Sequence, residues 1–110
     1  MTFDEYQKQA LTTVISTEDE FKDLLHWVLG MCGEAGEVAE KMKKIIRDKN
    51  SVITAEDKQE LAKELGDVLW YLAVFANDLG VSFDKVAEAN LSKLQSRHQR
   101  GVLGGSGDNR

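Results

Sequence analysis

Proline is absent from this chain of 110 residues, and cysteine occurs once, at Cys32. Without proline, no position carries the ring that breaks or kinks a helix, so long helices can run uninterrupted. A single thiol excludes an internal disulfide and favours a reducing compartment. We therefore expect a cytoplasmic protein whose fold is held together by packing.

Long apolar runs are also absent, and basic residues are fewer than acidic ones. The longest apolar run, residues 68–76, is too short to span a bilayer as a helix, and residues 1–5 lack the basic start of a signal peptide. The chain has 14 basic and 19 acidic residues, which gives a net charge of −5. The charge balance argues against a nucleic-acid partner, because binding to a phosphate backbone needs a basic surface, and the short apolar run argues against a membrane partner. A small phosphorylated substrate stays compatible, since a bound metal can invert the local field.

Four helices are the predicted architecture, because β-branched residues are scattered instead of alternating with polar ones. Thr2 with Glu5, and Thr17 with Glu20, have the spacing of capping boxes and predict helices over about 3–16 and 18–49. Thr54 caps a third predicted helix over about 55–79, which Gly80 terminates, and Ser82 opens a fourth over about 83–100. Residues 1–100 then form one all-α domain that resembles a four-helix bundle, and residues 101–110 form a flexible tail.

The third predicted helix also indicates assembly. It carries one long apolar stripe, and two further apolar residues, Trp70 and Val74, lie on its opposite side. A short chain offers too few neighbours to bury such a helix on every side, so we expect a homo-oligomer with a shared helical core, either a dimer or a tetramer. The stripe consists of Leu61, Leu65, Val68, Leu69, Leu72, Ala76 and Leu79.

Two pairs of carboxylates lie at helical spacing, Glu34 with Glu37 and Glu64 with Asp67. Residues three apart share a helix face, so packing of the two helices would bring up to four acids together. That many like charges need a cation, and hard oxygen ligands suit Mg²⁺.

Ordinary solvated surface is the competing interpretation of these acids. The surface interpretation suits Glu37, because Lys41 follows it by one turn of the helix. It suits Glu64 less well, because the residues at i−4 and i+3 from Glu64 are acidic. Glycines at 30, 33, 36 and 66 favour the metal site, since each costs about 1 kcal/mol against alanine in a helix interior. Such small residues let a ligand or a helix approach closely, and tight helix packing is an equally good reason for Gly36 and Gly66.

Two further features follow the acidic pairs. Tyr71 lies one turn beyond Asp67, next to the proposed metal site. Asn90, Lys93, Arg97 and Arg100 fall on one stripe of the last helix, at spacings of three, four and three. This stripe is either a solvated basic face or, if it lies opposite a metal site, a source of phosphate contacts.

Together these residues resemble a known family. Residues 29–40 (Leu-Gly-Met-Cys-Gly-Glu-Ala-Gly-Glu-Val-Ala-Glu) and 64–73 (Glu-Leu-Gly-Asp-Val-Leu-Trp-Tyr-Leu-Ala) are similar to the paired acidic motifs of the MazG-like all-α nucleoside triphosphate pyrophosphohydrolases. Residues 90–97 resemble that family's Asn-Lys-Arg element, and the likeness covers about residues 20–101. The His-Gln-Arg-Gly that follows Arg97 departs from the aromatic-proline pair often found there, which leaves substrate details open.

The resemblance implies an activity and a set of roles. Glu34, Glu37, Glu64 and Asp67 would bind Mg²⁺, or Mn²⁺ in its place, and Glu34 or Glu37 would be the catalytic base. Asn90, Lys93 and Arg97 would contact substrate phosphates, and Tyr71 is a further candidate for substrate binding. The implied reaction is hydrolysis of a (deoxy)nucleoside triphosphate to the monophosphate and pyrophosphate, as in nucleotide-pool housekeeping.

Two alternatives stay open. A relative in the same superfamily would act on dUTP or phosphoribosyl-ATP. A non-catalytic helical oligomerisation module would carry the same acids as solubilising surface.

Overall fold

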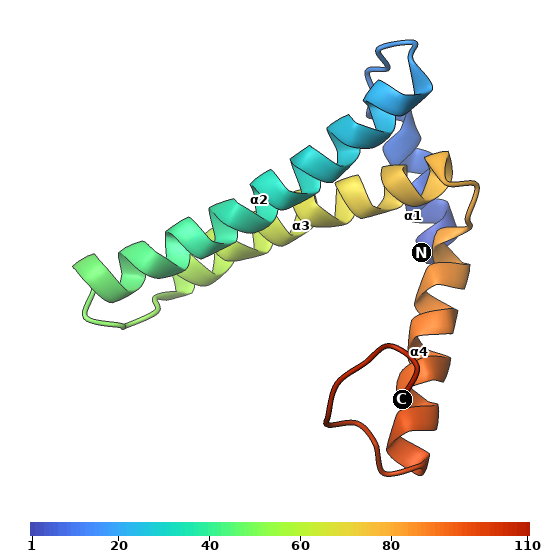
Figure 1. The fold of residues 1–110 in the computed structure, drawn as a ribbon. Coiled ribbons are helices and arrows are strands. Elements are labelled where there is room, and N and C mark those ends of the chain that lie inside the picture. The colour runs from blue at the N-terminus through green and yellow to red at the C-terminus, as the bar shows by residue number, and fades with distance from the viewer.

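The computed structural model describes residues 1–110 and contains four α-helices and no strand (Figure 1). They are α1 (Phe3–Ala10), α2 (Glu20–Asp48), α3 (Ala55–Asp78) and α4 (Phe83–Gln99), with the short 3₁₀ helix η1 (Leu11–Thr13) after α1. Helices α2 and α3 form a long antiparallel hairpin. Helix α1 lies at its open end, where α2 begins and α3 ends, and α4 runs away from the hairpin. The all-α, four-helix prediction is confirmed, although a single chain does not close into a bundle. None of the helices combines the length and the apolar character that crossing a bilayer requires.

Helix starts follow the sequence signals at three of four places. Thr2 and Thr54 each complete a capping box, and the Ser82 hydroxyl accepts a hydrogen bond from the Lys85 amide. The predicted capping box at Thr17 is wrong. There Asp19 is the N-cap of α2, because Glu18 has a positive φ of 64° that interrupts the helix before it.

A buried glutamine fixes the corner where α1, α3 and α4 meet. The Gln7 side-chain amide donates to the carbonyls of Ala73 and Val81, and its oxygen accepts from the Phe83 amide. Gly80, with φ of +77°, lets the chain turn out of α3. The Asp4 carboxylate then accepts from Ser82 Oγ and the Asp84 amide, so α1 holds the start of α4 at a steep angle to the hairpin.

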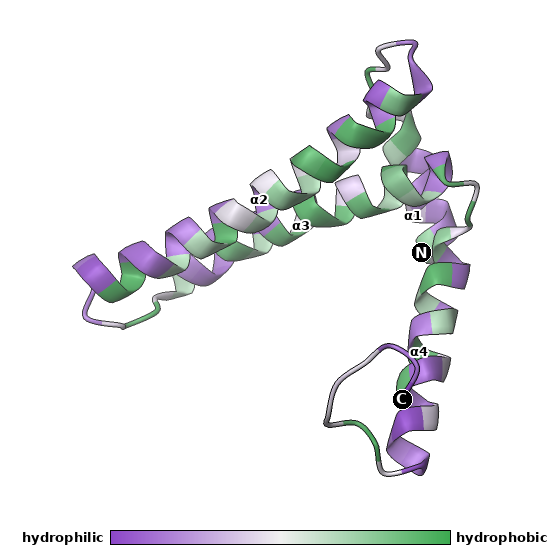
Figure 2. Ribbon diagram, in the orientation of Figure 1, coloured by the Kyte–Doolittle hydropathy of each residue, from purple (hydrophilic) through white to green (hydrophobic).

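The core lies at the same end of the molecule. Trp27 of α2 is 2 % exposed, and its indole N–H donates to Asp78 at 2.7 Å. Trp70 packs edge-on against it and donates to Thr13 of η1. Figure 2 shows the same gradient, with apolar residues gathered near this corner and polar ones toward the far tip of the hairpin.

Much of the apolar surface remains uncovered in one chain. The radius of gyration is 17.0 Å, whereas a compact domain of this length has about 13 Å. On α3 the stripe is divided: Val68 and Leu69 are half-buried, but Leu65, Leu72 and Leu79, spaced seven residues apart, are exposed. A single copy therefore leaves a line of leucines without a partner.

Residues 101–110, expected to form a flexible tail, follow a closed path back onto α4 (Figure 1). The Arg110 guanidinium donates to the carbonyls of Val102, Leu103, Gly104 and Gly107, and Arg100 donates to the carbonyl of Arg110. The flexibility of this segment stays a prediction, but its conformation here is hydrogen-bonded.

Among the glycines in the helices, Gly30 is distinguished by its packing. A Cβ atom built on Gly30 would overlap the Tyr71 ring, whereas Cβ atoms on Gly33, Gly36 and Gly66 would meet nothing within 4 Å. Gly30 is therefore needed for close approach of α3 to α2. Tight packing within the chain does not account for Gly36 or Gly66.

Gly30→Ala should consequently destabilise the fold, by about 1–3 kcal/mol, because the Tyr71 ring must move. Gly36→Ala should not lower the melting temperature, since alanine has the higher helix propensity and has room there. Thermal unfolding followed by circular dichroism compares the two variants. Equal melting temperatures for Gly30→Ala and the wild type would contradict this account of the packing.

Candidate metal centre

Three of the four predicted acids meet in the middle of the α2–α3 hairpin. Glu34 of α2 and Glu64 and Asp67 of α3 each place a carboxylate oxygen within 4.8 Å of the other two. Glu64 and Asp67 are one turn apart on α3 and share a face, and the antiparallel packing places Glu34 opposite them. We refer to Glu34, Glu64 and Asp67 as the acidic trio.

Burial and like charge act together on the trio. Burial is the main factor that raises the pKa of Glu34 above 4.5, and the neighbouring Asp67 carboxylate and a hydrogen bond with Glu64 raise it further. Glu34 and Glu64 are half-buried and Asp67 is exposed, so solvent screens the repulsion among these like charges only in part.

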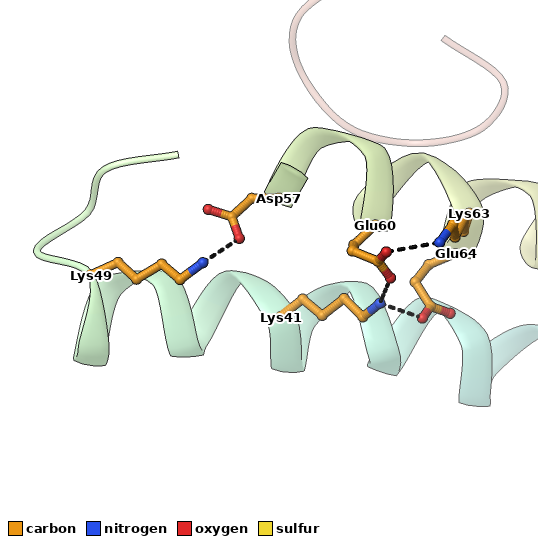
Figure 3. Close-up of polar contacts among 6 residues, drawn as sticks. All are labelled: Lys41, Lys49, Asp57, Glu60, Lys63 and Glu64. Atoms are coloured by element: carbon orange, nitrogen blue, oxygen red, sulfur yellow. Dashed lines mark hydrogen bonds and ion pairs between the residues drawn. The ribbon is translucent and has the colours of Figure 1, made fainter. Parts of the chain in front are cut away.

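One lysine reaches the trio from α2. Lys41 Nζ lies 2.9 Å from Glu64 Oε1 and 3.5 Å from Glu60 Oε2 (Figure 3). The other carboxylate oxygen of Glu60 lies 2.8 Å from Lys63 Nζ. The hydrogen bond with Glu64 is the largest influence raising the pKa of Lys41. Lys41 was expected to pair with Glu37 one turn before it, and it pairs instead across the hairpin.

Farther toward the tip, acids and lysines are matched. Lys49 at the end of α2 pairs with Asp57 at 2.6 Å. This hydrogen bond, together with those from Thr54, lowers the pKa of Asp57 to about 2. Along this hairpin the trio thus gathers negative charge with a single cation, Lys41, at its edge.

The trio fits a divalent cation. Mg²⁺ takes oxygen ligands at about 2.0–2.1 Å, so ligands on opposite sides of the ion lie about 4.2 Å apart. The three oxygens lie within 4.8 Å of one another, which is close to the spacing of ligands around one ion. The donors are all carboxylates, which suits Mg²⁺ or Mn²⁺ better than softer metals.

Glu37 lies outside the trio. It is exposed on α2 and close enough to Glu34 for its charge to contribute to the raised pKa of that residue. The structure thus brings together three of the four predicted ligands and leaves Glu37 beside them.

Tyr71 belongs to the packing of the hairpin. It is half-buried, lies against Gly30, and forms an aromatic cluster with Trp27 and Trp70. The Tyr71 ring therefore needs a glycine at position 30 on the facing helix.

The predicted phosphate contacts are not beside the trio. Asn90, Lys93 and Arg97 lie on α4, which packs on α1 and the end of α3 and then diverges from the hairpin (Figure 1). Arg97 is only 6 % exposed, because residues 101–110 cover it and the Asp108 carbonyl accepts from its guanidinium at 2.8 Å. Its Nε is buried without a hydrogen-bond partner.

Comparison with known proteins decides the family. The model of the MazG nucleotide pyrophosphohydrolase domain matches residues 20–102, which include both acidic motifs and all of α4. The chain belongs to this family. Its Glu34–Glu37 and Glu64–Asp67 pairs therefore lie inside a MazG domain, as the sequence resemblance implied.

Two curated relatives support this assignment. The Gene 37 protein of Mycobacterium phage L5 is 50 % identical over 114 residues, and the alignment covers 100 % of both chains. The protein YvdC of Bacillus subtilis (strain 168) is 39 % identical over 71 residues, which are 60 % of this chain and 67 % of YvdC. No solved structure matches the chain.

Glu34→Gln should raise the melting temperature of the metal-free protein at pH 7 by a few degrees. The folded-state pKa of Glu34 is raised, so the folded chain binds more protons than the unfolded chain and loses stability as pH rises above about 4.5. The glutamine amide of the variant carries no charge, so the variant does not lose this stability as the pH rises. Differential scanning calorimetry in chelator at pH 4 and pH 7 checks this, and the gain should shrink at pH 4.

Glu40→Gln is the matched control, because Glu40 lies on the same helix but pairs with Lys43 at 2.8 Å. It should not raise the melting temperature. A Glu34→Gln protein that melts at or below the wild-type temperature at pH 7 would show that the trio is not a site of charge repulsion.

Proposed function

We propose that this MazG-domain protein hydrolyses a (deoxy)nucleoside triphosphate to the monophosphate and pyrophosphate, using Mg²⁺ or Mn²⁺ bound by the acidic trio. The convergence of Glu34, Glu64 and Asp67 from two helices, within a MazG domain, carries this proposal. When bound, the metal supplies charge neutralisation of the triphosphate and polarisation of the phosphoanhydride.

The chain's own residues would perform the remaining steps. A water attacks the α-phosphorus, the bond between the α- and β-phosphates breaks, and pyrophosphate leaves. Glu37 is the better candidate for the base that accepts the water's proton, since it lies next to the trio without being part of it. If Glu37 instead rotates in as a fourth ligand, Glu34 would take that role.

We further propose that a second copy completes the site. Within one chain α4 diverges from the trio, so Asn90, Lys93 and Arg97 would reach the substrate from a partner in a homodimer or homotetramer. The exposed Leu65 and Leu72 on α3 provide an apolar surface for such a contact. Arg97 would become available only if residues 101–110 move aside.

A panel of nucleotides that includes common and damaged (d)NTPs, dUTP and phosphoribosyl-ATP tests the activity with Mg²⁺. Pyrophosphate should be released from at least one of them, and the panel separates the standard substrates from dUTP and phosphoribosyl-ATP. Glu64→Gln should lower turnover at least about a hundredfold, because it removes a ligand charge from the metal.

Glu40→Gln serves as the control here too and should keep wild-type turnover, because Glu40 pairs with Lys43 outside the trio. Release of inorganic phosphate without pyrophosphate would contradict the position of cleavage. Absence of any turnover and of any Mg²⁺-induced rise in melting temperature would favour the non-catalytic helical module.

A further inference from the structure

Lys41 forms the one ion pair that connects the acidic trio to a cation. Its ammonium group lies 2.9 Å from Glu64, whose side chain is 14 % exposed. Glu34 and Asp67 form no ion pair with any lysine or arginine. The charge that offsets the trio in this structure therefore comes from one flexible side chain.

That same side chain has a second partner within reach. Glu60 lies one turn before Glu64 on α3, and its Oε2 is 3.5 Å from Lys41 Nζ (Figure 3). Lys41 and Glu60 also line a cavity of about 330 Å³ between α2 and α3. The ammonium group thus has both room and an acceptor on the side away from the trio.

A metal ion and the ammonium group cannot both stay at full contact with Glu64. A divalent ion bound by that carboxylate repels a cation a few ångströms away, and each weakens the hold of the other. Binding of the metal then requires Lys41 to leave Glu64 or to remain there at an electrostatic cost.

We propose that Lys41 is the resident counter-ion of the metal centre: its ammonium group neutralises Glu64 in the metal-free protein and transfers to Glu60 when a divalent ion binds. Lys41 is then a positioning residue that sets the metal concentration at which the site fills. This inference rests on the proposed metal-dependent function and adds the residue that competes with the metal.

Mn²⁺ binding to the 110-residue chain, measured by electron paramagnetic resonance and by calorimetry without nucleotide, tests the proposal. Lys41→Met should bind Mn²⁺ about three- to tenfold more tightly than the wild type, because the competing cation is gone. Lys41→Arg keeps the charge and should not tighten binding.

Lys43→Met is the matched control. It removes the same charge from the same helix, but Lys43 pairs with Glu40, outside the trio. Its Mn²⁺ affinity should stay within about twofold of the wild type, since solvent and salt screen a distant exposed charge.

Glu60→Gln tests the transfer step separately. Loss of the second acceptor should weaken Mn²⁺ binding in the wild-type background, and the weakening should be smaller in the Lys41→Met background. Such non-additivity is the signature of two residues that act through one exchange. Equal effects in both backgrounds would overturn the transfer of Lys41 to Glu60.

The outcomes separate the two proposals. If the wild type binds Mn²⁺ and Lys41→Met binds it equally or more weakly, the counter-ion role is overturned and the metal site stands. If the wild type and Lys41→Met both fail to bind Mn²⁺, the metal centre itself is refuted, and the role of Lys41 is refuted with it.

Discussion

The packing of α3 against α2 forces Glu34, Glu64 and Asp67 into one small region, and the other features of the site depend on that constraint. Like charges at this spacing repel one another, most strongly where burial limits screening. The hairpin tolerates them because its apolar corner, built around Trp27 and the Gly30–Tyr71 contact, holds the two helices in register. The site is thus a locally unfavourable arrangement supported by packing elsewhere in the chain.

The distribution of charge along the hairpin supports this view. Toward the tip, Asp57 pairs with Lys49 and Glu60 pairs with Lys41 and Lys63. Within the trio, only Glu64 forms an ion pair with a basic residue, which is Lys41. A chain that used its acids only for solubility would have no reason to gather three of them and leave two without a cation.

The sequence was sufficient to predict the helices and most of the acidic cluster, because both depend on local spacing. Capping signals at Thr2, Thr54 and Ser82 and the i, i+3 acidic pairs are readable from neighbours in the chain. Contacts across the hairpin were not predictable, since spacing within one helix says nothing about the facing residue. Spacing within α2 therefore predicts Lys41 as a partner of Glu37 and does not predict the fit of Tyr71 onto Gly30, although the glycine's unfavourable helix propensity is a visible signal. The divergence of α4 depends on Gln7 and Asp4, which act across more than seventy residues of sequence.

We expect a divalent ion to bind between α2 and α3. A crystal structure of the protein soaked with Mn²⁺, recorded at a wavelength where manganese scatters anomalously, tests it most directly. The account predicts a peak of anomalous density within coordination distance of oxygens from Glu34, Glu64 and Asp67. Crystals in which manganese binds elsewhere, while these three carboxylates stay in contact without an ion, would contradict it.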